Sequence, residues 1–265
     1  MARILVTGAS DGLGRALAET LAARGHELVV HGRDPDRLAA VAEKTGGVPL
    51  RADLSRMAEV RALADAVSDR YDSLDVLVNN AAVGFGAPNA PRVMTPDGIE
   101  LRLAVNYLAP YLLSRLLLPL LRRARPPTAR IVNVASIGQR DVDLDDLMMD
   151  RGYDGTEAYR RAKLALIADT FDLASQEQRE GTGVTVNAVH PAVLMPTTMV
   201  REARTGTIET LEEGLANTLR VVDGPEVAGL TGRYFEGPRE ARGRAQAYDE
   251  AFRTRLAAQA EALVR

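Results

Sequence analysis

The sequence predicts an α/β fold built on one doubly wound, mostly parallel sheet with helices on both faces, as a single domain over residues 1–265. Short β-branched runs alternate with longer helical patterns from the first residue, and no Pro/Ser-rich linker or internal repeat divides the chain. The strand runs are almost continuously apolar, which is typical of strands buried on both faces. Repeated strand–helix–strand units then place helices on either side of a parallel sheet.

Six runs are expected to form strands, at residues 4–6, 28–30, 48–50, 76–78, 131–134 and 184–189. Between them, apolar residues recur at helical spacing, as in 13–23 and 60–67. Two irregular segments, 137–155 and 191–206, follow the fifth and sixth strands. Because ligands bind beyond the carboxyl ends of parallel strands, we expect both segments to form the walls of a substrate pocket, with a lid over about 191–225.

Composition narrows the classes of partner. The chain has 46% apolar and 26% charged residues and a net charge of −3, with acids and bases interleaved, so no basic surface for nucleic acid is expected. The absence of cysteine excludes disulfides, thiolate nucleophiles and Cys-ligated zinc. The N-terminus lacks a signal-peptide pattern, and the apolar stretch around 112–121 is short and interrupted. We therefore expect a cytoplasmic protein without a membrane span.

A glycine-rich turn follows the first strand, with the sequence Thr7-Gly8-Ala9-Ser10-Asp11-Gly12-Leu13-Gly14. Glycine permits a tight turn and a close approach to a pyrophosphate, and the following helix N-terminus offers unpaired N–H groups. A turn without a ligand is the alternative, but its place between a buried strand and an amphipathic helix favours a Rossmann-type dinucleotide site. A P-loop is excluded, because no Gly-Lys-Ser/Thr follows the turn.

The end of the second strand indicates which dinucleotide binds. NAD-specific folds place an acidic residue there for the ribose 2′-OH, whereas this chain has Arg33, whose guanidinium can pair with a 2′-phosphate. The predicted cofactor is therefore NADP(H). NAD(H) stays open as the alternative, since Asp34 and Asp36 lie close by and a solvated surface arginine fits the same pattern. His31 is expected to touch the adenosine phosphate or to lie in an exposed loop.

Tyr159 and Lys163 are four residues apart in a strong helical pattern, which places them on one helix face. An ammonium beside a phenol is expected to lower the pKa of the phenol towards the working range. Only Lys44 and Lys163 are lysines among the 33 basic residues, so a lysine here indicates a position that arginine cannot fill. An ordinary surface pair is the alternative. Ser136 ends the fifth strand, where it can bind a substrate carbonyl or simply form a turn.

These residues together resemble the short-chain dehydrogenase/reductase family over essentially the whole chain. The glycine turn matches the family's TGxxxGxG motif, Asp53-Leu54 matches the acid that contacts adenine, and Asn79-Asn80-Ala81-Ala82 matches its NNAG segment with Ala82 in place of Gly. Asn106, Ser136, Tyr159 and Lys163 match the catalytic tetrad. The insert DVDLDDL and the tail Gly232-Arg233-Tyr234-Phe235 are similar to the retinol-dehydrogenase-like branch and its bacterial relatives.

The resemblance implies NAD(P)-dependent hydride transfer between the nicotinamide and the carbonyl or alcohol carbon of a small apolar substrate, with NADP preferred. It makes Asn106, Ser136, Tyr159 and Lys163 catalytic, with Asn106 anchoring a water that passes protons from Lys163 to solvent. The expected cofactor-binding residues are Gly8, Ser10, Asp11, Gly12, Leu13, Gly14, Arg33, Asp53, Leu54, Asn80, Ala81, Ala82, Tyr159, Lys163, Pro191 and Thr197. A homodimer or homotetramer is also expected from the family.

Three other interpretations fit the sequence less well. Asp141, Asp143 and Asp145 have the D-x-D-x-D spacing of a calcium loop, but Asp146 stands where a turn glycine is needed and Gly152 where a bidentate glutamate is needed, so no metal is expected. A nucleotide-sugar epimerase or dehydratase would have TGxxGxxG spacing and a larger C-terminal domain. A non-redox regulator that senses NADP(H) would have no need of Tyr159.

Overall fold

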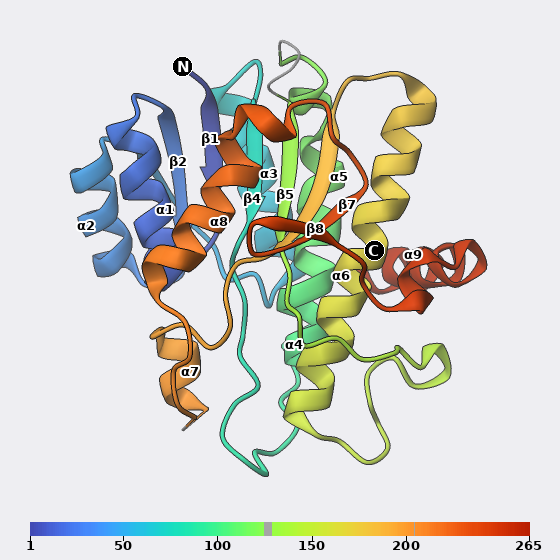
Figure 1. The fold of residues 1–265 in the computed structure, drawn as a ribbon. Helices are drawn as coiled ribbons and strands as arrows, with labels where there is room; N and C mark the ends of the chain where they lie inside the picture. The colour runs from blue at the N-terminus through green and yellow to red at the C-terminus, as the bar shows by residue number, and fades with distance from the viewer. Residues whose placement is uncertain (125–128, 204) are drawn as a thin grey trace.

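The computed structural model describes residues 1–124, 129–203 and 205–265. Within them, one eight-stranded sheet has the order β3-β2-β1-β4-β5-β6-β7-β8 (Figure 1). Seven strands are parallel, and β8 pairs antiparallel with β7. The strands are β1 (Arg3–Val6), β2 (Glu27–Gly32), β3 (Val48–Arg51), β4 (Val76–Asn79), β5 (Arg130–Val134), β6 (Thr185–His190), β7 (Arg233–Glu236) and β8 (Arg239–Ala241).

The prediction of a doubly wound parallel sheet is confirmed, and the six predicted strands coincide with β1 to β6 within two residues at each end. The prediction missed β7 and β8, which are short and rich in charge, although Tyr234 and Phe235 of β7 are buried. Burial on both faces is wrong for β3. This strand lies at the sheet edge, where Val48 and Leu50 are half-buried and Pro49 and Arg51 are exposed.

Helices cover both faces of the sheet, as predicted (Figure 1). Neighbouring strand residues point into different cores, since Val6 packs under the first of two helical layers and Leu5 under the second. The first helical layer contains α1 (Gly12–Ala23), α2 (Pro35–Thr45) and α8 (Leu211–Asp223). The second contains α3 (Met57–Arg70), α4 (Leu101–Leu103), the π-helical turn η1 (Ala104–Leu108), α5 (Ala109–Leu121) and α6 (Gly155–Glu180), with α9 (Glu250–Val264) packed against α6. The remaining elements are α7 (Thr198–Glu202) and the 3₁₀ turns Leu144–Asp146, Pro225–Val227 and Ala245–Tyr248.

The continuous helical stretch Leu101–Leu121 is long and apolar enough to cross a membrane by length and composition, with a mean hydropathy of 1.3. However, 83% of the apolar window is buried inside the protein, as in a core helix. Arg115 in this stretch pairs with the buried Asp169 of α6 at 2.7 Å, which joins it to the second helical layer. This helix is weak evidence for a span, and the absence of a membrane span stays a prediction.

Candidate active site

A large cavity of about 1150 Å³ lies beyond the carboxyl ends of β1, β2, β4, β5 and β6. One end of it is lined by the glycine turn and Arg33, and the other by Ser136, Tyr159 and the segment after β6. All the predicted site residues except Asn106 line this one cavity, namely Gly8, Ser10, Asp11, Gly12, Leu13, Gly14, Arg33, Asp53, Leu54, Asn80, Ala81, Ala82, Ser136, Tyr159, Lys163, Pro191 and Thr197.

The glycine turn has the backbone that a pyrophosphate site requires. Gly8 and Gly12 have φ values of +65° and +50°, which favour glycine, and a Cβ on Gly14 would collide with the Gly8 carbonyl oxygen. Asp11 caps α1 by accepting from Gly12 N–H at 2.8 Å. No hydrogen bond among the described residues uses the next two N–H groups, of Leu13 and Gly14, so both can bind an anionic group.

His31 holds this turn from behind, and the exposed loop position expected for it is wrong. The residue is only 1% exposed, and burial lowers the pKa of His31 to about 4, so the ring is neutral near pH 7. Its Nδ1 accepts from Gly8 N–H at 3.2 Å, which leaves the proton on Nε2 for the carbonyl oxygen of Ala52 at 3.0 Å. Both ring nitrogens are therefore already bonded within the protein, and His31 links β1 to the end of β3.

The Arg33 end of the cavity carries charges of both signs, and they differ in how far they are already paired. Within the described part of the chain, the Arg33 guanidinium makes no hydrogen bond or ion pair. Arg37 forms two long ion pairs, at 3.8 Å with Asp11 and at 3.7 Å with Asp34. Burial tends to raise the pKa of Asp53, but hydrogen bonds from Ser55 and the charge of Arg33 lower it overall, so Asp53 is ionised here. This end therefore offers the guanidinium groups of Arg33 and Arg37 and the carboxylates of Asp34 and Asp53 to a nucleotide.

The opposite end gathers Tyr159, Ser136 and Lys163. The Ser136 side chain is close enough to the Tyr159 phenol to lower its pKa, and Ser136 Oγ accepts from Gly138 N–H at 3.0 Å. Lys163 Nζ lies 5.7 Å from the centroid of the Tyr159 ring and donates to the carbonyl oxygen of Val134 at 2.7 Å. A proton donor, a second hydroxyl and a buried amine thus meet at one point of the cavity wall.

The family model for short chain dehydrogenase matches residues 2–207. The chain belongs to this family. It is 31% identical to human retinol dehydrogenase 14, an alignment that covers 96% of this chain and 83% of that protein. It is 33% identical to retinol dehydrogenase 13 of Mus musculus, over 98% of this chain and 83% of the relative. The solved complex of Pseudomonas aeruginosa RhlG with NADP superposes with a TM-score of 0.72 at 27% identity, over 89% of this chain and 94% of that one. The retinol-dehydrogenase-like resemblance is confirmed, and the chain is an oxidoreductase with a nicotinamide-cofactor fold.

The electrostatics of Tyr159 differ from the expectation. Burial raises the pKa of the Tyr159 phenol, and the hydrogen bond with Ser136 offsets this only in part. Burial also lowers the pKa of Lys163 to about 7. The predicted lowering of the Tyr159 pKa by a fixed ammonium is therefore wrong for the protein alone, because desolvation drives both groups towards their neutral forms.

Asn106 lies outside the cavity, in the π-helical turn η1, and is fully buried. Its Oδ1 accepts from Val83 N–H at 2.7 Å, and its Nδ2 donates to the Val83 carbonyl oxygen at 2.9 Å. Val83 itself lines the cavity, so the Asn106 side chain fixes a piece of the wall. The predicted part of Asn106 in a proton relay stays a prediction.

The two irregular segments contribute unequally to the cavity. Residues 191–205 line it almost throughout the part that the structure describes, and Arg204 lies outside the described residues. The insert contributes only Ile137, Gly138 and Asp154, and its acidic middle faces away, with Asp141 2.6 Å from Arg244. The expectation that all of 137–155 forms a pocket wall is wrong. No cluster of three metal-ligating side chains is found among the described residues.

Sequence reasoning missed three contacts that shape the site. The Phe85 ring meets the Tyr159 ring edge to face, with centroids 5.2 Å apart and an angle of 89°. Thr198 on α7 donates to Asp11 Oδ2 at 2.6 Å, which ties the segment after β6 to the glycine turn. The Tyr234 hydroxyl donates to the Ser136 carbonyl oxygen at 3.1 Å. None of these residues carries a local signal, because each contact joins segments that are distant in the chain.

Proposed function

We propose that the protein is an NADP(H)-dependent oxidoreductase that moves hydride reversibly between the nicotinamide and a carbonyl or alcohol carbon of an apolar substrate. The observation that carries this proposal is the continuous cavity that runs from the free guanidinium of Arg33, unpaired among the described residues, to the hydroxyl groups of Tyr159 and Ser136. Its volume of about 1150 Å³ is large enough for a dinucleotide along the glycine turn and a small substrate beside Tyr159.

The proposed preference for NADP(H) rests on the guanidinium groups at the adenosine end. Arg33 and Arg37 both line the cavity, and the Arg33 guanidinium is free among the described residues to form a bidentate pair with a 2′-phosphate. The similar Pseudomonas aeruginosa protein was solved with NADP, which supports the same choice. Asp34 supports NAD(H) binding only weakly, because its Oδ1 already caps α2 by accepting from the N–H groups of Asp36 and Arg37.

The residues of the catalytic end perform the proton chemistry. When bound, the cofactor supplies or accepts the hydride. Ser136 Oγ accepts from Gly138 N–H, which leaves the Ser136 proton available for the Tyr159 or substrate oxygen. Tyr159, kept protonated by burial, donates its proton to the forming alkoxide. Lys163, fixed by Val134, lies behind the phenol and can replenish that proton.

Apolar side chains form part of the cavity wall. Val83, Phe85, Leu194, Met195 and Met199 line the cavity, and such side chains bury hydrocarbon without offering polar partners. The relatives named retinol dehydrogenase act, by their names, on an extended apolar alcohol. We therefore propose apolar aldehydes or ketones, and the corresponding primary or secondary alcohols, as the substrate class.

Steady-state oxidation of NADPH with a panel of aliphatic, isoprenoid and aromatic aldehydes and ketones tests the proposal. Tyr159→Phe is expected to lower kcat by a factor of about 10²–10⁴ while NADPH binding is retained, because only the proton donor is lost. Turnover of the variant close to wild type would show that Tyr159 has another role. NADPH binding without turnover across the panel would instead favour a cofactor-sensing regulator.

A further inference from the structure

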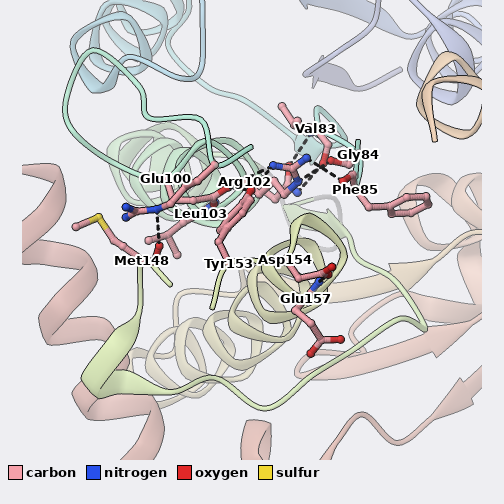
Figure 2. A network of polar contacts seen from close by, with 12 residues as sticks. Val83, Gly84, Phe85, Glu100, Arg102, Leu103, Met148, Tyr153, Asp154 and Glu157 are labelled. Atoms are coloured by element: carbon pink, nitrogen blue, oxygen red, sulfur yellow. Dashed lines mark hydrogen bonds and ion pairs between the residues drawn. The ribbon is translucent and has the colours of Figure 1, made fainter. Parts of the chain in front are cut away.

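A buried polar network lies behind the active-site wall (Figure 2). Arg102 of α4 and Glu100, the residue that caps α4, have side chains only 5% and 2% exposed, and their closest N and O atoms are 3.4 Å apart. The Tyr153 hydroxyl accepts from Arg102 Nη1 at 2.6 Å and donates to Glu100 Oε1 at 2.9 Å. Two buried charges and a half-buried phenol therefore satisfy one another, which fixes the direction of the guanidinium.

The other edge of the guanidinium holds the loop after β4. Arg102 Nε donates to the carbonyl oxygen of Gly84 at 2.8 Å, and Nη2 donates to that of Phe85 at 2.9 Å, as Figure 2 shows. A planar fork can bind two successive carbonyl groups at once, which a lysine ammonium at this position cannot do with the same geometry. The path of the backbone at Gly84 and Phe85 is thus set by one side chain.

This loop is the one that contacts the catalytic tyrosine. The Phe85 ring lies edge to face with the Tyr159 ring, and both residues line the cavity. The network also reaches the helix that carries Tyr159, because Tyr153 directly precedes Asp154, the residue that caps α6. Close packing locks the two parts together, since a Cβ on Gly155 would lie 2.6 Å from the Phe85 carbonyl oxygen.

We propose that Arg102, oriented by Glu100 and Tyr153, is a positioning residue that holds Phe85 against Tyr159 and so aligns the phenol with the substrate oxygen. The inference deepens the proposed function and rests on Tyr159 being the proton donor. It assigns no contact with substrate or cofactor to Arg102 itself. Phe85 is the residue through which the network acts, and its ring forms part of the wall that the substrate meets.

The chain offers a matched control in a second arginine–carboxylate pair. Arg115 of α5 pairs with the buried Asp169 of α6 at 2.7 Å, and neither residue lines the cavity. Arg115→Gln therefore breaks a comparable ion pair without touching the loop after β4. Tyr153→Phe is the mildest variant of the network, because it removes one hydroxyl and leaves the Arg102–Glu100 pair in place. Arg102→Lys keeps the charge but loses the fork.

Two measurements on the full-length variants separate positioning from mere stability. Hydrogen exchange of the amides at residues 83–87 reports the loop directly and needs no substrate. Turnover with NADPH and with cofactor deuterated at the transferred position reports the chemical step. We expect Tyr153→Phe and Arg102→Lys to speed exchange in 83–87 and to lower kcat by up to about a hundredfold, with a raised isotope effect and an unchanged Kd for NADPH.

Phe85→Leu removes the ring that contacts Tyr159 but keeps the bonds from Arg102 to the loop backbone. It should therefore lower kcat in the same way, while the amide exchange of residues 83–87 stays near wild type. Arg115→Gln should change neither the exchange of this loop nor the isotope effect. The proposal is overturned if the network variants leave 83–87 as protected as in wild type, or if they lose no more kcat per folded molecule than Arg115→Gln. If wild-type protein reduces no carbonyl compound, the proposed function fails, and faster exchange of 83–87 in Tyr153→Phe still decides whether the network holds the loop.

Discussion

Replacing Lys163 by methionine should stabilise the cofactor-free protein at neutral pH. Burial lowers the pKa of Lys163 to about 7 from 10.5, so the unfolded state binds more protons between these two pH values and stability rises with pH across them. Protonation of Lys163 in the unfolded state lowers the free energy of unfolding by about 4 kcal/mol at pH 7, and by only about 1 kcal/mol at pH 10. Losing the hydrogen bond to the Val134 carbonyl oxygen costs Lys163→Met about 1–2 kcal/mol at either pH. The variant should therefore be about 2–3 kcal/mol more stable than wild type at pH 7, with no gain at pH 10.

Urea unfolding of both proteins at pH 7 and pH 10, without cofactor, measures this difference. Lys44→Met is the control, because Lys44 is the only other lysine in the sequence, with a side chain that is 57% exposed and pairs with Glu19. Its replacement should change stability by less than about 0.5 kcal/mol. The reasoning is refuted if Lys163→Met gains nothing at pH 7, or gains equally at pH 7 and pH 10.

Three further predictions concern the two ends of the cavity. Arg33→Ala should weaken NADPH binding about 10- to 100-fold and spare NADH, because a charge-assisted hydrogen bond to the 2′-phosphate is lost; fluorescence titration measures both, and equal losses would remove the basis for an NADP preference. Since the folded pKa of His31, about 4, lies below 6.5, the wild type should lose about 2 kcal/mol at this site between pH 7 and pH 5. His31→Asn should flatten that part of the urea-unfolding pH profile, and an unchanged slope would contradict the assignment. Gly84→Ala should lower kcat/KM, because its Cβ would collide with Met199 of α7; adding Met199→Ala should restore it, whereas no recovery would mean that the collision is not the cause.

The sequence predicts the parts of the fold that depend on local pattern. Apolar runs specify β1 to β6, and the glycine turn specifies where the nucleotide site begins. The pattern fails at β7 and β8, because the strands are short and Arg233, Glu236, Arg239 and Glu240 dilute their apolar character. There the sheet itself supplies the missing stability, as β7 pairs with the buried β6 and places Tyr234 and Phe235 in the cores.

The same limit applies to the candidate site. Helical spacing predicts that Tyr159 and Lys163 share a face, and the strand end predicts that Ser136 lies nearby, since both inferences need only local geometry. The proton states are not local. The pKa of each group depends on desolvation by residues from other segments, such as Phe85 after β4, and that of Tyr159 also depends on Ser136 after β5. A motif therefore locates a catalytic pair, but tertiary packing decides that the buried phenol is protonated and that the amine titrates near neutral pH.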